Sequence, residues 1–84
     1  MEGIDIQLVE FMIPFSSAIA GKPIVELGFP RDSLIVLINR DENFFVPSGG
    51  TVLEEGDVVL TLVNQKNLAE VRDILMRWKK PKEE

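Results

Sequence analysis

The run Leu34-Ile35-Val36-Leu37-Ile38 constrains the fold more than any other segment of this 84-residue chain. Five consecutive apolar residues, of which three are β-branched, are too few for a buried helix and are typical of a strand. Because the run is continuous rather than alternating, it predicts a central strand that is buried on both faces of its sheet. Residues 39–43 are polar and predict a turn, after which Phe44-Phe45-Val46 forms the second strand of a hairpin and ends at Pro47.

Two further strands are expected. Residues 4–13 are extended, with apolar side chains at alternate positions up to Leu8 and in the opposite phase from Val9 onward. Such a change of phase predicts a β-bulge, or a far half of the strand that is covered on both sides. Residues 58–63 form a second apolar run and predict the last strand.

Two helices are expected as well. Pro23 and Gly28 stand where a short helix would have its first residue and its C-terminal glycine. A longer helix starts at Asn67, which stands three residues before Glu70 as in a capping box, and ends before Pro81. Its apolar stripe includes Trp78, which is therefore expected in the core or at a dimer contact.

The expected order is strand, short helix, three strands and long helix. The sequence therefore predicts an α+β fold with a small, mostly antiparallel sheet and β-α-β-β-β-α order. No internal repeat or linker interrupts residues 1–84, so we expect one domain with a core at about 7–76 and a charged tail at 79–84.

Composition excludes several functions. The chain has no cysteine and no histidine, so thiol nucleophiles, histidine-based triads and thiolate zinc sites are excluded and no enzymatic activity is expected. A net charge of −5 has the wrong sign for binding nucleic acid. No apolar run is long enough to span a bilayer and the first residues lack a basic start, so we expect a cytoplasmic domain without direct membrane insertion.

Few side chains suggest a site. Arg40 follows the most buried strand and is expected to meet a ligand phosphate or carboxylate, to meet a partner subunit, or to pair with Asp41 or Glu42 at the surface. Arg31 is a similar case in a connecting loop. The Gly49-Gly50 pair lacks the Lys-Ser/Thr ending of a phosphate-binding loop and is interpreted as a turn.

One acidic cluster supplies the oxygen ligands that a cation site needs. Glu54, Glu55 and Asp57 flank Gly56, but their spacing is not that of an EF-hand loop, so we interpret them as solvated turn residues.

An ordered set of landmarks resembles a known family. The landmarks are Gly21-Lys22 at the start of the short helix, an apolar strand ending in Arg40, Pro47 after the next strand, and Gly56-Asp57 before the last one. Together they resemble the TrkA-C domain, the C-terminal lobe of the RCK regulators of potassium channels and transporters. The resemblance covers roughly residues 7–76.

The resemblance implies a function. Such domains are regulatory: they form homodimers, bind a small ligand at or near the dimer interface and pass the binding energy to an attached transport protein. The segments around Leu27–Asp41 and Phe45–Pro47 are most similar to the copies found behind the membrane domain of bacterial potassium/proton antiporters. This implies a membrane transport domain as partner and a position at the cytoplasmic face of the membrane.

The resemblance also implies a ligand site. Ligand-sensing members bind cyclic di-AMP in an apolar cleft, which maps by position onto Phe29, Pro30, Arg31, Leu34 and Pro47. With Arg40, these residues form the predicted ligand-binding set, and cyclic di-AMP or another nucleotide is the implied ligand. The alternative is a purely structural dimerisation module of a transporter, or of a separate potassium-uptake regulator, that binds no ligand.

Overall fold

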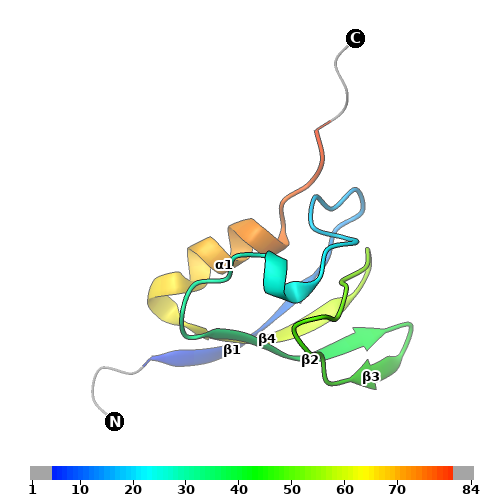
Figure 1. Cartoon of the computed structure of the whole chain (residues 1–84). Helices are drawn as coiled ribbons and strands as arrows, with labels where there is room; N and C mark the ends of the chain where they lie inside the picture. The colour runs from blue at the N-terminus through cyan, green and yellow to red at the C-terminus, as the bar shows by residue number, and fades with distance from the viewer. Residues whose placement is uncertain (1–4, 81–84) are drawn as a thin grey trace.

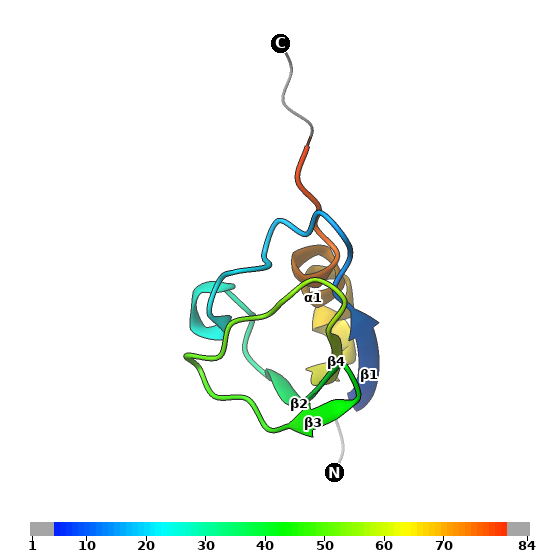
Figure 2. The ribbon, with the colours of Figure 1, turned by 90° about the vertical axis from the view of Figure 1, so that its right-hand side faces the viewer.

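A four-stranded antiparallel sheet with one α-helix on one of its faces forms the body of the molecule (Figures 1 and 2). The computed structural model describes residues 5–80. The elements are β1 (Ile6–Met12), η1 (Ile24–Glu26), β2 (Ser33–Arg40), β3 (Asn43–Phe45), β4 (Val58–Asn64), η2 (Gln65–Asn67) and α1 (Leu68–Leu75). The spatial order of the strands is β1-β4-β2-β3. The predicted α+β class is confirmed, and the short helix is a single 3-10 turn, η1.

Strand β1 pairs regularly with β4, from Ile6 opposite Asn64 to Met12 opposite Val58. Both predicted explanations of the phase change are therefore wrong: β1 has no bulge, and Met12 in its far half is 60% exposed. The irregularity of the sheet lies in β2, between Ile35 and Leu37. The two sets of alternating apolar residues in β1 lie on opposite faces of the sheet. Phe11 points into the core, whereas Leu8 is 57% exposed on the opposite face.

Strand β2 lies between β4 and β3, so its predicted central position is confirmed. The prediction that both of its faces are buried is wrong. Ile35 and Ile38 are buried, but Leu34 is 60% exposed because α1 covers only one face of the sheet. The continuous apolar run therefore reflects one covered face and one open apolar face.

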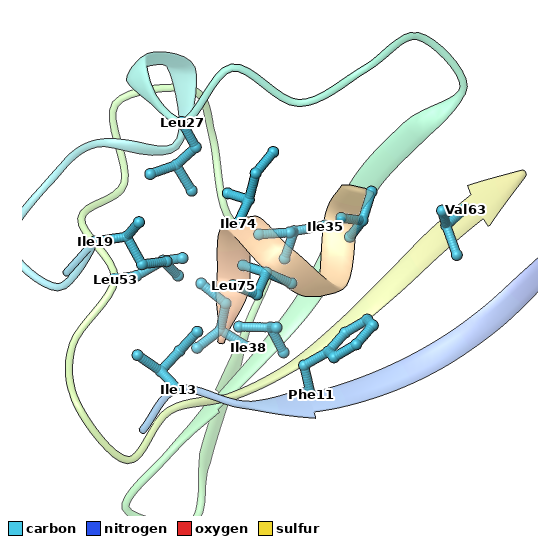
Figure 3. Packing of buried hydrophobic residues seen from close by; sticks show 12 residues of the cluster. Phe11, Ile13, Ile19, Leu27, Ile35, Ile38, Leu53, Val63, Ile74 and Leu75 are labelled. Carbon is cyan, nitrogen blue, oxygen red and sulfur yellow. The ribbon is translucent and has the colours of Figure 1, made fainter. Parts of the chain in front are cut away.

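The hydrophobic core lies between α1 and the sheet and extends under the loops at one end (Figure 3). Val71 and Leu75 of α1 are fully buried, as are Ile38 and Val59 of the central strands. The remaining buried apolar side chains are Phe11, Ile13, Ile19, Leu27, Ile35, Leu53, Val63 and Ile74. The core thus includes residues of the segment between β1 and β2 and of the loop between β3 and β4, which fixes both segments against the sheet.

The helix is shorter than the apolar stripe predicted. It ends at Leu75, and the chain then runs extended beside the loop after β1: Ala18 N–H donates to Arg77 O (2.8 Å) and Lys79 N–H to Ser16 O (2.7 Å). Trp78 pairs with Ser17 in an isolated β-bridge and is 59% exposed, so its placement in the helix and in the core is wrong. These backbone bonds to a distant loop override the helical periodicity.

The predicted capping box at Asn67 is also absent. Asn67 makes no side-chain cap to α1. Its amide Nδ2 instead donates to Arg31 O at 2.7 Å, while Asn64 Oδ1 caps η2 by accepting from Lys66 N–H at 3.1 Å. Among residues 5–80, no helix is long and apolar enough to cross a bilayer.

Candidate functional site

The loop between η1 and β2 carries three of the predicted ligand residues, Phe29, Pro30 and Arg31. Phe29 packs against the core and anchors the loop from within. The backbone of the loop is held by β4 and η2, because Asp32 O accepts from Asn64 N–H (3.1 Å) and Arg31 O accepts the bond from Asn67 described above. The loop is thus fixed, and the exposed Arg31 side chain extends from it toward solvent.

Leu34, the fourth predicted residue, lines an open groove of about 430 Å³ where β2 begins. The other lining residues are Ile6, Asp32, Ser33 and Leu62. Ile6, Leu34 and Leu62 lie on the face of the sheet that α1 leaves uncovered, because Leu34 is opposite Leu62 in the sheet and Leu62 is opposite Leu8. The groove is therefore mainly apolar, and Asp32 is the one charged residue of its lining.

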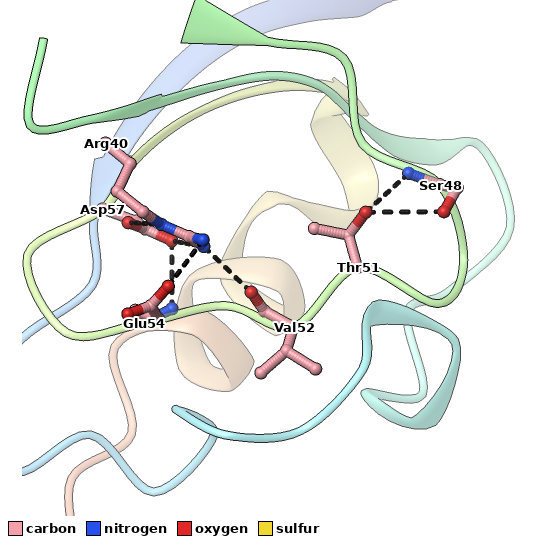
Figure 4. Close-up of polar contacts among 6 residues, drawn as sticks. All are labelled: Arg40, Ser48, Thr51, Val52, Glu54 and Asp57. Atoms are coloured by element: carbon pink, nitrogen blue, oxygen red, sulfur yellow. Dashed lines mark hydrogen bonds and ion pairs between the residues drawn. The ribbon is translucent and has the colours of Figure 1, made fainter. Parts of the chain in front are cut away.

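Pro47 follows β3 and begins a loop that pairs with the segment around η1. Val25 N–H donates to Gly49 O and Ile24 N–H to Thr51 O, both at 2.9 Å. Within the loop, Thr51 Oγ1 accepts from Ser48 N–H at 2.9 Å and closes a turn (Figure 4). This geometry fits the turn predicted for Gly49-Gly50.

Arg40 lies in a network of internal contacts (Figure 4). Its Nε and Nη2 donate to Asp57 Oδ1 and Oδ2 at 2.9 and 2.7 Å, Nη2 also donates to Val52 O at 2.9 Å, and Nη1 lies 2.5 Å from Glu54 Oε2. The guanidinium also lies over the ring of Phe45, 5.1 Å from its centroid. Neither predicted surface partner, Asp41 or Glu42, forms an ion pair with it.

The carboxylate of Asp57 is the centre of this network. Its side chain is 1% exposed, against 28% for Arg40. Besides the two bonds from Arg40 it accepts from Glu54 N–H at 2.9 Å. The hydrogen bond to Asp57 raises the pKa of Arg40 above its ordinary value, with the charges of Asp57 and Glu54 acting in the same direction and burial opposing them. Arg40 therefore joins the end of β2 to the loop before β4.

The interpretation of the acidic turn as solvated is wrong for Asp57, which is buried. Asp57 faces Arg40, and Glu55 accepts a hydrogen bond from Ser16 N–H. Within the described part of the chain, no group of three or more acidic side chains is placed to hold a metal ion.

The structure therefore separates the predicted ligand residues into distinct places. Leu34 lines the groove next to the loop that carries Arg31, whereas neither Arg40 nor Pro47 is part of its lining. Their roles in ligand binding stay predictions. Sequence reasoning missed Ile6 and Leu62 as groove residues, although the alternation of apolar and polar residues in 4–8 was a signal that one apolar phase faces away from the core.

The anchor of the Arg31 loop can be tested separately. Replacing Asn67 with alanine removes the 2.7 Å bond to Arg31 O, and we expect a loss of about 1 kcal/mol in the free energy of unfolding, measured by urea denaturation. Asn64→Ala, which removes the η2 cap, is expected to have a similar cost without freeing Arg31 O. An unchanged stability in Asn67→Ala would show that this bond does not hold the loop.

Comparison with known proteins places the chain in a family. The model of the TrkA-C domain matches residues 8–76. The Trk system potassium uptake protein TrkA homolog of Pyrococcus horikoshii is 33% identical over 75 residues, which cover 88% of this chain and 33% of that protein. TrkA of Mycobacterium tuberculosis is 40% identical over 53 residues, covering 63% of this chain and 24% of that protein. The chain thus spans a third or less of the length of these relatives.

Solved structures share the fold. The RCK_C domain dimer of S. agalactiae BusR in complex with c-di-AMP is 25% identical with a TM-score of 0.69, covering 81% of this chain and 88% of that chain. An RCK domain with cda is 24% identical with a TM-score of 0.72, covering 81% of this chain and 96% of that chain, and at this identity it shows the fold alone. Because the family model spans most of the residues and the landmarks appear in the same order, this chain belongs to the TrkA-C domain family.

Proposed function

We propose that this chain is a regulatory domain of a potassium transport protein, that it acts as a homodimer, and that it binds a small anionic ligand. The observation that carries the proposal is an apolar groove that continues into an uncovered apolar face of the sheet. Membership of the TrkA-C family supports the connection to potassium transport, since the relatives named above are potassium uptake proteins.

The uncovered face supports the dimer. We call it the open sheet face, and it consists of Ile6, Leu8, Glu10, Met12, Leu34, Leu37, Asn39, Phe44, Val58, Leu60, Leu62 and Asn64. Nine of these residues are apolar and one is charged, and Leu8, Leu34 and Phe44 are more than half exposed. A contiguous apolar surface of this kind on a small domain is typical of an interface.

The groove supports a nucleotide ligand. Leu34 and Leu62 offer an apolar surface of the kind on which a base packs, and Arg31 is an exposed cation on the adjoining loop that is suited to a phosphate. Cyclic di-AMP is the first candidate, because the BusR domain named above was solved in complex with c-di-AMP. Pro30 lies on the same loop as Arg31, and Phe29 holds that loop by packing against the core. Pro47 lies outside the groove lining and stays a predicted ligand residue, and Arg40 positions the loop between Pro47 and β4.

Such a domain works by shifting populations and needs no catalysis. A ligand that favours one arrangement of the dimer by about 1–3 kcal/mol changes the gating equilibrium of an attached transporter roughly 5- to 150-fold. We propose that the attached protein is a cation/proton antiporter and that the domain lies at its cytoplasmic face.

Thermal unfolding tests the ligand. The purified domain is heated with cyclic dinucleotides, AMP, ATP, NAD, potassium or magnesium. A ligand at one hundred times its dissociation constant adds about 2.7 kcal/mol, which for a domain of this size raises Tm by about 10 °C or more. We expect this shift with cyclic di-AMP. A flat panel would favour the alternative, a structural dimerisation module without a ligand.

The role of Arg31 is tested with the same measurement. We expect Arg31→Ala to weaken cyclic di-AMP binding about 10- to 100-fold, because it removes a charge-assisted hydrogen bond to a phosphate. Lys22→Ala is the matched control, since it removes the same charge from another exposed position. Equal affinities of the two variants would exclude Arg31 from the site.

A further inference from the structure

The C-terminal part of the described chain differs in charge from the rest of the molecule. Residues 5–71 carry ten acidic and four basic side chains. Residues 72–80 carry one acidic side chain, Asp73, and the four basic side chains Arg72, Arg77, Lys79 and Lys80, all of which are exposed. The sequence then continues with one lysine and two glutamates outside the described residues, so an excess of positive charge remains over 72–84.

Large apolar side chains are exposed at the same end. Trp78 is 59% exposed and Met76 41%. Phe15, 83% exposed, lies in the neighbouring loop, which runs beside the C-terminal segment where Ser17 pairs with Trp78. Figure 1 shows this loop and the C-terminal segment together at the end of the molecule away from β3. Basic and apolar side chains thus share one surface, which we call the basic aromatic end: Phe15, Arg72, Met76, Arg77, Trp78 and Lys80. This surface also includes Asp73, whereas Lys79 lines a separate hollow with Glu54 and Glu55.

The backbone of this surface is held in place. The two bonds between residues 16–18 and 77–79 fix the position of Trp78 relative to the body. Ser17, its bridge partner, is buried, and its Oγ accepts from Ile19 N–H (3.1 Å) and Ala20 N–H (3.2 Å). The backbone at Trp78 therefore keeps its position on the molecule while the side chain is exposed.

We propose that the basic aromatic end binds the surface of a membrane that contains anionic lipids. Lysine and arginine are attracted to anionic headgroups, and tryptophan and phenylalanine prefer the zone between headgroups and acyl chains. The acidic residues elsewhere on the chain oppose this attraction only weakly, because charges farther than a Debye length of about 10 Å from the bilayer are screened at 0.1 M salt.

Other anionic partners fit the surface less well. An open hollow of about 700 Å³ lies here, lined by Arg72, Asp73, Met76, Arg77, Trp78 and Lys80. Every one of these side chains belongs to an exposed residue, so the hollow lacks the buried polar groups that orient a small molecule. Asp73 lines the hollow itself, and Glu54 and Glu55 line a separate hollow with Lys79, so carboxylates on both sides reduce the attraction for a compact anion. A membrane surface carries many anionic headgroups and contacts several basic side chains at once, so it is less sensitive to these carboxylates than a single small anion is.

Trp78 provides a direct readout, because the chain has one tryptophan and no tyrosine. The full chain is titrated with vesicles of phosphatidylcholine mixed with phosphatidylglycerol at about 0.1 M salt, where charges more than about 10 Å from the bilayer are screened. We expect the emission of Trp78 to shift to shorter wavelength and brominated lipids to quench it. Vesicles of phosphatidylcholine alone, or mixed vesicles in 1 M salt, should produce little shift, because the Debye length falls to about 3 Å. The absence of a shift with the anionic vesicles would refute the proposal.

Charge variants assign the binding to these residues. Arg77→Gln/Lys80→Gln is expected to weaken vesicle binding roughly 25-fold, at about fivefold for each basic residue near the surface. Lys22→Gln/Lys66→Gln makes the same change in net charge at exposed positions outside the basic aromatic end and should bind as the parent does. Equal weakening in both variants would mean that only net charge matters and would overturn the proposal. So would an emission shift with poly-glutamate and none with vesicles, which would indicate a soluble acidic partner. The result does not depend on whether the groove at Leu34 binds a nucleotide.

Discussion

Replacing Arg40 with methionine is expected to lower the free energy of unfolding by about 3 kcal/mol, because it leaves the carboxylate of Asp57 buried without a counter-ion. The variant keeps the length of the apolar stem and removes only the guanidinium, so lost packing contributes little. Three hydrogen bonds and the contact with Glu54 disappear together. Urea unfolding of the purified domain at neutral pH measures the loss.

A double-mutant cycle separates the interaction energy of Arg40 with Asp57 from the effect of each substitution alone. Asp57→Asn alone should cost less, about 1–2 kcal/mol, because Arg40 is partly exposed and keeps Glu54 and Val52 O as partners. The double variant Arg40→Met/Asp57→Asn should recover part of the loss seen in Arg40→Met, since the buried charge is then gone. Additive losses would mean that the two side chains do not stabilise the fold as a pair. Lys22→Met, at an exposed position, is the control for removing a cation.

The Arg40–Asp57 contact shows what the sequence does and does not determine. Both residues are landmarks of the TrkA-C pattern, but the pattern does not indicate that they pair. It predicts a ligand, a partner subunit, or an ion pair with Asp41 or Glu42 for Arg40, and a solvated turn for Asp57. Arg40 and Asp57 are 17 residues apart in the sequence. Without the loop geometry, the sequence offers four other carboxylates as partners for Arg40: Asp41, Glu42, Glu54 and Glu55. Choosing between carboxylates at such separations requires the loop geometry, which residue patterns do not contain.

The elements themselves were more predictable than their environments. The strands at 34–39 and 58–63 were found because short β-branched runs between turn residues have few other solutions. Their exposure was not found, because an apolar residue facing a partner has the same pattern as one facing the core. The sequence therefore predicts a buried position for Leu34 and a change of phase after Leu8, although both residues lie on the open sheet face.

Trp78 illustrates the opposite error. Its spacing from Val71 and Leu75 continues the helical period, but the helix ends at Leu75, which is also its last buried residue. The backbone of residues 77–79 bonds with the 16–18 loop instead. A tertiary contact of this kind has no signal in the local sequence. Trp78, whose position the sequence predicts wrongly, is the residue whose emission tests the membrane proposal.

Replacing Leu8 with lysine is expected to weaken the proposed dimer about 100-fold. Leu8 is 57% exposed in the single chain, so lysine is tolerated there by the folded monomer. In a twofold-symmetric dimer each substitution occurs twice, and two unpaired charges at about 1.4 kcal/mol each multiply to a hundredfold change in Kd. Sedimentation at a series of concentrations measures the dissociation constant.

The matched control for this prediction is Val25→Lys, which introduces the same charge at an exposed valine of η1, away from the open sheet face. If Val25→Lys dissociated the dimer and Leu8→Lys did not, the interface would lie on the η1 side and the open face would need another explanation. If the parent chain were monomeric at every concentration, the dimer proposal itself would be wrong. The ligand experiment separates these cases further: a dimer that tightens with cyclic di-AMP in the parent and not in Leu8→Lys would join the groove at Leu34 to the interface, because the groove shares that face of the sheet.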